Sequence, residues 1–333
     1  MSNIYICENG VQVGISEGRC QITQNKNLIN SIPVKDIEGI TILGRAQLTT
    51  QLVEYCLTNG VNVSYFSKGG KYFGKLESSQ HVNAYRQRKQ CELYNTDFRL
   101  MLAKKIICSK IHNQYVVLKR YERYSDIQCK SEERMIKIAE IQSRNAQTIN
   151  ELMGHEGLGA KMYFQGLGKC IDSEFYFEKR SRRPPLDEFN SMLSLGYSIL
   201  IREIQCAIEN HGMNAYLGFL HSDSQNVPTL ACDLIEEWRA VIVDATVASI
   251  VNKPIIRKEH FERQEGQDGI FLIRDGCRIF LDNMERKLST KIQYLNYLEY
   301  PVDFRHAIDA QINQLIKAIE ENNVNLYTPL WIR

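Results

Sequence analysis

The chain has 333 residues, of which 44% are hydrophobic and 24% charged, and its formal net charge is +2. This length and apolar content suffice for two cores, while so small a net charge neither requires nor excludes a nucleic-acid partner. The N-terminus lacks a basic and apolar leader, and the longest apolar run, residues 240–251, is far shorter than the roughly 20 residues that span a bilayer, so we expect a cytoplasmic protein that does not enter membranes.

Short alternating apolar runs predict strands over most of the first 80 residues. Strands are expected at residues 4–7, 11–16, 19–23 and 37–43, and Asn9-Gly10 is a hairpin signal between the first two. A helix is expected at about 49–58, because Asn59-Gly60 easily forms a left-handed cap. Strands at 61–66 and 71–76 follow.

From about residue 84 the pattern becomes helical, with apolar residues at the three- and four-residue spacing of a buried helix face. Further helical segments are expected at 129–153, 156–177, 187–210, 230–251, 278–292 and 302–321. This order predicts an α+β protein: a small N-terminal β domain at 1–80, a linker at 81–90, and a larger all-α-helical domain at 91–333. It excludes a doubly wound sheet.

A histidine just ahead of an acidic helix indicates metal chemistry. His221 lies in Gly-Phe-Leu-His-Ser-Asp (218–223), and Asp233, Glu236 and Glu237 follow at spacings that place them on one helix face. Imidazole combined with carboxylates suits Mn²⁺ as well as Mg²⁺. From these residues alone the alternative stays open, because acidic helix faces are commonly solvated and single histidines are commonly structural.

Basic residues form three clusters that could bind the phosphates of a nucleic acid. The third cluster lies in a loop stiffened by Pro184-Pro185, which would hold its charges in place. Solvated charge on helix faces explains such clusters equally well. The clusters are Arg86, Arg88 and Lys89; Lys104, Lys105 and Lys110; and Lys179, Arg180, Arg182 and Arg183.

Glu156, in Gly154-His-Glu-Gly157, is expected near the N-terminus of a helix, where an acid complements the helix dipole. The chain has no G-x-S-x-G, no phosphate loop and no H-E-x-x-H. Serine hydrolases of the nucleophile-elbow type, P-loop nucleotide hydrolases and zinc proteases of the H-E-x-x-H type are therefore excluded.

Four patterns occur in a fixed order along the chain. They are the run E-G-x-x-A-x-x-Y-F from Glu156, R-x-P-P-x-D-x-x-N from Arg182 to Asn190, G-F-L-H-S-D (218–223) and D-L-I-E-E-W-R (233–239). Together they resemble the CRISPR-associated spacer-acquisition integrase family over nearly the whole chain. The combination in this order is specific, although each pattern alone is not.

The resemblance implies a site that holds Mg²⁺ or Mn²⁺ on Glu156, His221 and Glu236, with Asp233 as a further catalytic residue. Glu236 stands where many relatives have Asp, so which of Asp233, Glu236 and Glu237 contacts the ion stays open. Supporting roles near the site are implied for two further residues, Asn190 and Tyr163.

The resemblance also implies the activity and the partners. The helical domain would be the catalytic domain of a metal-dependent DNA integrase and endonuclease, which inserts short fragments into the CRISPR repeat by 3′-hydroxyl transesterification. Its partners would be double-stranded DNA, a second copy bound through the β domain, and the small ferredoxin-like subunit of the adaptation complex. Contacts to DNA are expected from Arg86, Arg88, Lys179, Arg180, Arg182 and Arg183. The alternatives are a non-catalytic DNA-binding scaffold and a stand-alone metal-dependent nuclease.

Overall fold

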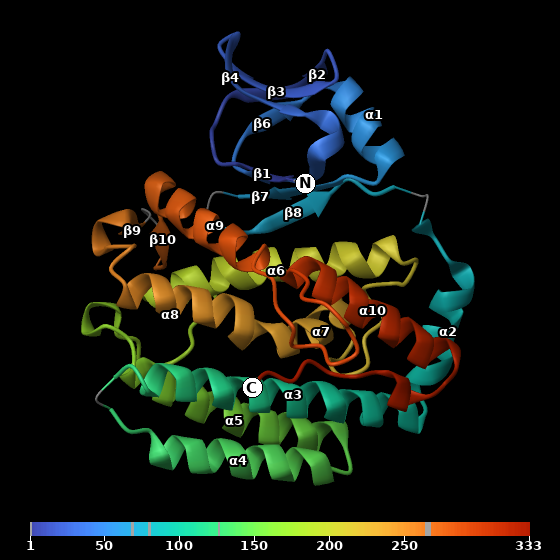
Figure 1. Cartoon of the computed structure of the whole chain (residues 1–333), viewed down its shortest axis with the longest axis vertical. Helices are drawn as coiled ribbons and strands as arrows, with labels where there is room; N and C mark the ends of the chain where they lie inside the picture. The colour runs from blue at the N-terminus through green and yellow to red at the C-terminus, as the bar shows by residue number, and fades with distance from the viewer. Residues whose placement is uncertain (1, 68–69, 79–80, 126, 264–267) are drawn as a thin grey trace. The chain divides into compact units, whose positions relative to one another are not determined.

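The computed structural model describes residues 2–67, 70–78, 81–125, 127–263 and 268–333. The chain divides into two compact units, Met1–His81 and Val82–Arg333. Strands dominate the first unit and helices the second, which confirms the α+β class predicted from the sequence (Figure 1).

Two four-stranded sheets form the first unit, and isoleucine and valine side chains fill its core. The helix predicted before Asn59-Gly60 is present as α1 (Thr50–Asn59), and Gly60 has a φ of 69°, which gives it the left-handed cap. One sheet has the order β1 (Ser2–Ile6), β5 (Ile37–Leu43), β7 (Asn62–Phe66), β8 (Tyr72–Lys75). The other has the order β4 (Asn27–Pro33), β3 (Arg19–Gln24), β2 (Val11–Ser16), β6 (Ala46–Leu48).

The prediction of a hairpin at Asn9-Gly10 is wrong. Strand β1 pairs in parallel with β5, whereas β2 pairs with β3 and β6 in the other sheet. Gly10 has a φ of 73°, and its amide donates to the carbonyl of Arg45 at 2.8 Å. A turn residue of this kind permits a change of sheet as readily as a hairpin, so the local signal cannot select the pairing partner.

The second unit contains nine α-helices among its described residues. A short hairpin of β9 (Phe261–Arg263) and β10 (Ile270–Leu272) accompanies them, which corrects the expectation of a purely helical domain. The helices are α2 (Ala84–Tyr94), α3 (Asp97–Glu122), α4 (Lys130–Asn145), α5 (Ile149–Lys169), α6 (Glu188–Asn210), α7 (Thr229–Arg239), α8 (Ala245–Asn252), α9 (Arg274–Leu288) and α10 (Phe304–Glu320).

Helix α2 occupies most of the segment that the sequence assigned to a linker at 81–90. Asn83 caps this helix by accepting a hydrogen bond from the amide of Arg86 at 3.2 Å. The buried side chain of Gln90 donates to the carbonyl of Asn214 at 3.0 Å, which fixes α2 to the loop after α6. The polar composition of this segment therefore marks a helix bonded to its neighbours rather than a connecting coil.

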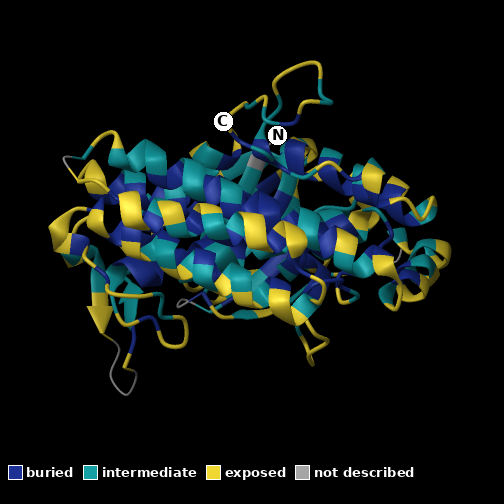
Figure 2. Ribbon diagram, turned by 90° about the horizontal axis from the view of Figure 1, so that it is seen from below, coloured by how far each residue is buried: buried dark blue, intermediate teal, exposed yellow. Residues whose placement is uncertain are grey.

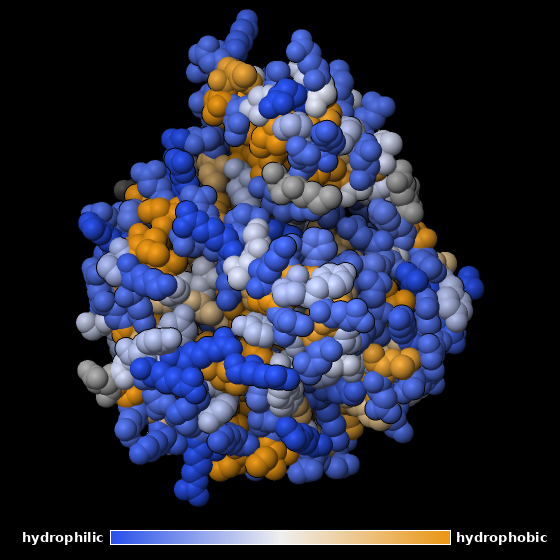
Figure 3. Space-filling model, viewed as in Figure 1, coloured by the Kyte–Doolittle hydropathy of each residue, from blue (hydrophilic) through white to orange (hydrophobic). Residues whose placement is uncertain are grey.

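Helix α3 packs against α4, α5 and α7 and so brings together elements from distant parts of the sequence. Figure 2 shows buried residues between the helices and exposed residues along their outward sides. Trp238 of α7 is fully buried, and its Nε1 donates to Gln311 at 2.8 Å. On the face drawn in Figure 3, hydrophobic side chains form separate patches among hydrophilic ones. Within the described ranges no helix is long and apolar enough to cross a bilayer.

Candidate metal centre

Glu156 lies in the middle of α5 and not near its N-terminus, which corrects the position predicted from the sequence. The helix begins earlier because Thr148 accepts a hydrogen bond from the amide of Glu151 at 3.1 Å. Gly154 and Gly157 do not end it, since α5 continues past both glycines to Lys169. The glycines flanking Glu156 thus lie within a continuous helix.

Glu156 and Glu236 meet at one cation, the side chain of Lys110. Lys110 lies on α3 and Glu236 on α7, and the ammonium forms ion pairs with Oε1 of Glu156 and Oε2 of Glu236. The side chains are 6% exposed for Lys110, 15% for Glu156 and 4% for Glu236, so the three charges are largely shielded from solvent. The packing of α3 against α5 and α7 therefore converges two acids that are far apart in sequence.

The carboxylate of Glu236 is held in its charged form. Burial alone would raise its pKa, but the nearby cations Arg239 and Lys110, followed by His221, outweigh burial and lower the pKa to about 2. Nη1 of Arg239 lies 3.1 Å from Oε1 of Glu236, one turn along α7. Oε2 of Glu236 is buried and accepts no hydrogen bond of normal geometry from the described residues.

Asp233 holds the loop that carries His221. Its Oδ2 accepts the amides of Phe219 at 2.6 Å and Leu220 at 2.9 Å, and its Oδ1 accepts the amide of His221 at 3.0 Å. The residue is fully buried. With both oxygens committed to the loop, Asp233 orients His221.

The imidazole of His221 completes this arrangement. Its Nδ1 lies 2.7 Å from Oδ1 of Asp233, and because a carboxylate can only accept, Nδ1 carries the proton. Burial lowers the pKa of His221, but the hydrogen bond and charge of Asp233, with Glu236, outweigh it and raise the pKa above its usual value. In the neutral ring, Nε2 is the nitrogen that can ligate a metal.

Gly218 is required where the loop passes α7. A Cβ at this position would lie 2.7 Å from Oδ2 of Asp233 and 2.7 Å from the backbone carbon of Thr229. The hydroxyl of Thr229 accepts the amide of Gly218 at 3.0 Å. The motif Gly-Phe-Leu-His therefore combines a close backbone approach with three amides that bind one carboxylate.

Glu237 faces away from Glu156, toward the C-terminal segment 327–332. Its carboxylate accepts hydrogen bonds from the hydroxyl of Tyr327 at 2.5 Å, the amide of Leu330 at 2.6 Å and the side chain of Gln311 at 2.9 Å. Burial raises the pKa of Glu237 to about 7, although these hydrogen bonds oppose the shift. Of the three acids on α7, Glu236 is thus the one directed at Glu156.

The C-terminal segment 327–332 was missed by sequence reasoning. Asn113 of α3 donates to the carbonyl of Leu330 at 3.1 Å and accepts the amide of Ile332 at 3.1 Å. His112 stacks on Trp331 with ring centroids 4.0 Å apart. The segment therefore fastens α3 next to the turn that presents Lys110, and it carries no acidic or histidine pattern that could have indicated this role.

In the part of the chain that the structure describes, Tyr163 and Asn190 hydrogen-bond to residues other than the three proposed ligands. The buried hydroxyl of Tyr163 donates to Asp244 at 2.9 Å, and Tyr197 donates to the other oxygen of Asp244 at 2.5 Å. Asn190 lies in the first turn of α6, where its amide group donates to Asp187 at 2.7 Å and its oxygen accepts from Arg180 at 2.8 Å. Tyr163 therefore ties α5 to the segment after α7, and Asn190 ties the start of α6 to the loop before it.

The basic residues proposed for DNA fall into two groups. Arg86 forms an ion pair with Glu320 at 2.8 Å, and Arg180 donates to Asn190 and to Ser194, so both have partners within the protein. The other four are exposed, one on α2 and three in the loop before α6: Arg88, Lys179, Arg182 and Arg183. All six DNA contacts remain predictions.

The donor set suits a divalent cation, since two carboxylates and one imidazole nitrogen are ligands that Mn²⁺ and Mg²⁺ accept. Within the described ranges no group of three or more metal-binding side chains is already assembled around one point. Lys110 stands between Glu156 and Glu236, which shows that the position between them accommodates a cation. Cys232 is no competing nucleophile, because burial raises the pKa of its thiol to about 11.

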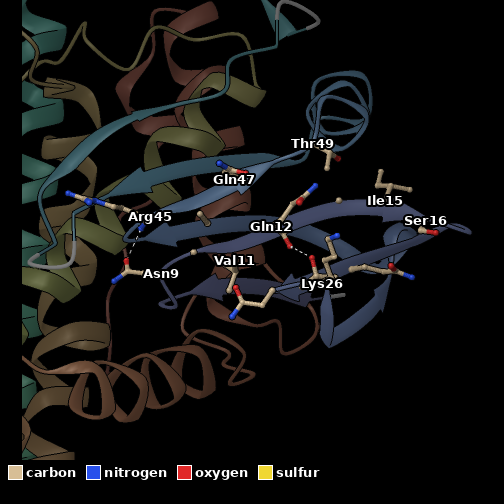
Figure 4. A pocket seen from close by; sticks show the side chains of 15 residues that line it. Asn9, Val11, Gln12, Ile15, Ser16, Lys26, Arg45, Gln47 and Thr49 are labelled. Carbon is tan, nitrogen blue, oxygen red and sulfur yellow. Dashed lines mark hydrogen bonds between the residues drawn. The ribbon is translucent and has the colours of Figure 1, made fainter.

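A cleft of about 700 Å³ in the first unit is unsuited to the same chemistry (Figure 4). Amide, hydroxyl and basic side chains line it together with a few apolar residues, and it contains no carboxylate or imidazole. Figure 4 shows Asn9 beside Arg45, whose backbone amide donates to Oδ1 of Asn9 at 3.1 Å. The lining residues are Asn9, Gly10, Val11, Gln12, Gly14, Ile15, Ser16, Gln21, Thr23, Asn25, Lys26, Arg45, Ala46, Gln47 and Thr49.

A profile of the family described as "CRISPR associated protein Cas1" matches residues 4–286. The chain belongs to the Cas1 family. A relative from Mycobacterium tuberculosis (strain CDC 1551 / Oshkosh), named "CRISPR-associated endonuclease Cas1", is 32% identical over 323 residues, which cover 96% of this chain and 94% of the relative. The resemblance inferred from the four sequence patterns is thereby confirmed.

Solved Cas1-related structures share the fold. A structure titled "Casposase bound to integration product" has a TM-score of 0.86 at 24% identity and covers 100% of this chain and 96% of its own. One titled "Cas6-RT-Cas1--Cas2 complex" has a TM-score of 0.84 at 21% identity, and this chain spans only 36% of that longer protein. At these identities the likeness establishes the architecture of both units.

Proposed function

We propose that the chain is a metal-dependent DNA integrase and endonuclease of CRISPR adaptation, which inserts short DNA fragments into the CRISPR repeat. The observation that carries the proposal is the meeting of Glu156 and Glu236 at one cation, in the same unit as a histidine oriented by a buried aspartate. Membership of the Cas1 family and the casposase fold support the same reaction class.

The metal would be Mg²⁺ or Mn²⁺, held by Glu156, Glu236 and Nε2 of His221. A divalent ion bound there would supply a Lewis acid that polarises a non-bridging phosphate oxygen. The chain's own residues prepare the site for it. Asp233 keeps the proton of His221 on Nδ1, and Arg239 and Lys110 keep Glu236 ionised.

The reaction exchanges one phosphodiester for another. The 3′-hydroxyl of the incoming fragment forms a new bond to the repeat phosphorus, and the bond from that phosphorus to its original 3′-oxygen breaks. The attacking hydroxyl loses its proton and the departing 3′-oxygen gains one, so no ATP is required. Water in place of the 3′-hydroxyl gives cleavage without joining, which accounts for nuclease activity at the same site.

Double-stranded DNA, a second copy of the chain and a small ferredoxin-like subunit are the proposed partners. Arg88, Lys179, Arg182 and Arg183 are exposed and would contact the DNA backbone. The fold is shared with a protein titled as bound to an integration product and with one titled as a Cas1–Cas2 complex, which supports DNA and a small partner subunit.

The test is strand transfer of a labelled duplex with free 3′-hydroxyls into a plasmid that carries the repeat, with Mn²⁺ or with chelator, in the presence of the small partner. His221→Ala should abolish joining while DNA affinity stays nearly unchanged. His155→Ala, which removes a histidine beside Glu156 that has no assigned role, is the matched control and should join normally.

Three other outcomes would contradict the proposal. Cleavage without joining in the wild type would replace the proposal with a stand-alone nuclease. DNA binding without cleavage or joining would refute the metal-dependent mechanism and favour a non-catalytic scaffold. Joining that persists in chelator would also refute the metal-dependent mechanism.

A further inference from the structure

Lys110 is a buried cation in the position between the two acids that would hold the metal. Its ammonium forms ion pairs with Glu156 and Glu236, and only 6% of its side chain is exposed. It comes from α3, whereas the acids come from α5 and α7, so this one side chain ties three helices together. A surface lysine that pairs with acids by chance would not be enclosed in this way.

In the absence of metal, the ion pairs offset the repulsion between the two carboxylates. Two carboxylates brought together away from water repel each other, and a positive charge between them removes that repulsion. Arg239 contributes a second positive charge, but it pairs with Oε1 of Glu236, whereas Lys110 pairs with Oε2. Among the described residues, Lys110 is the cation that pairs with both acids.

The oxygens that face the ammonium are the ones a metal would need. Lys110 contacts Oε1 of Glu156 and Oε2 of Glu236, and the second oxygen accepts no hydrogen bond of normal geometry within the described residues. A divalent ion that binds both oxygens would occupy the position of the ammonium, so the two cations cannot be there together. The positive charges of the divalent ion and of the Lys110 ammonium would also repel each other strongly at such close range.

We propose that Lys110 is the counter-ion of the metal-free site, and that a divalent cation binds by displacing its ammonium from Glu156 and Glu236. This inference rests on the proposed metal site. Lysine suits the role because its ammonium is a compact charge on a flexible stem, which can leave without moving α3. In the metal-free protein Lys110 then shields the two acids from solvent and holds them in position. Because it competes with the metal, it also lowers the affinity of the site for a divalent cation.

Calorimetric titration of the full chain with Mn²⁺ tests the proposal. Lys110→Met removes the charge and keeps the length of the side chain. It should bind Mn²⁺ at least tenfold more tightly than the wild type, because the competing cation is gone. It should also unfold at a lower temperature than the wild type in chelator, and gain more on addition of Mn²⁺.

Lys105→Met is the matched control. Lys105 lies on the same helix and donates to the carbonyl of Tyr327 at 2.8 Å, with no ion pair to Glu156 or Glu236. This variant removes the same charge from α3 and should leave the Mn²⁺ affinity within about twofold of the wild type, which separates local competition from a general change in net charge.

Equal or weaker Mn²⁺ binding by Lys110→Met, with measurable binding by the wild type, would overturn the displacement and leave the metal site intact. Absence of Mn²⁺ binding in the wild type would refute the metal site itself and the displacement with it. If Lys110→Met is recovered unfolded even with Mn²⁺, Lys110→Gln carries the same comparison, since it also removes the charge while keeping a polar group between the acids.

Discussion

Replacing Asp233 by Asn should release the loop that carries His221. Asp233 is fully buried and accepts four hydrogen bonds: the amides of Phe219 and Leu220 at Oδ2, and the amide and Nδ1 of His221 at Oδ1. Asn has a single acceptor oxygen, and its amino group would face donors on the other side. At least two of the four bonds are therefore lost.

The magnitude follows from these contacts. A hydrogen bond to a charged group contributes about 1.5–3 kcal/mol, so the loss of two costs about 3 kcal/mol at the lower end of that range. Since 1.4 kcal/mol is a factor of ten, the loop should open about 100-fold more often.

Hydrogen exchange followed by mass spectrometry measures this opening directly. In Asp233→Asn the amides of residues 219–221 should exchange about 100-fold faster than in the wild type. Asp223→Asn is the control, because Asp223 is an exposed acid in the same loop and should change exchange by less than about twofold. Rates in Asp233→Asn within threefold of the wild type would refute the view that this carboxylate holds the loop.

Two further predictions concern stability. Burial raises the pKa of Asp244 from 3.8 to about 6, although hydrogen bonds from two tyrosines oppose the shift. Between about pH 4 and 6 the folded protein therefore binds a proton that the unfolded chain has lost. The free energy of unfolding should fall by about 3 kcal/mol as the pH rises through this window. Asp244→Asn has no carboxyl group to titrate, so its free energy of unfolding, measured with urea and compared with that of the wild type, should improve by about 3 kcal/mol from pH 4 to pH 7.5. A difference between the two proteins that does not change with pH would contradict the pKa shift of Asp244. Gly218→Ala should lower the free energy of unfolding by about 1–3 kcal/mol because its Cβ would meet the backbone of α7, whereas Gly157→Ala, with open space around it on a helix, should raise it by about 0.5–1 kcal/mol. Thermal shifts of the same sign in both glycine variants would count against this reasoning.

Local patterns in the sequence predicted several elements correctly. The left-handed cap at Gly60, the strand at 37–43 and the long helix before residue 210 follow from residue conformations and from apolar spacing, which act within a few residues. The order of the four patterns also indicated the Cas1 family and the acids of the candidate site. The same local signals failed at Asn9-Gly10 and at the start of α5, where turn residues and glycines are compatible with more than one continuation.

Which charged groups meet depends on how the helices pack. Asp233, Glu236 and Glu237 follow one another on α7, yet one binds the His221 loop, one faces Glu156 and one faces the C-terminal segment. In the sequence Lys110 belongs to a basic cluster that could bind phosphates, whereas the packing of α3 against α5 and α7 places its ammonium at two acids. Ion pairs and buried hydrogen bonds depend on distances in space, and these distances are set by the packing of helices that lie far apart along the chain.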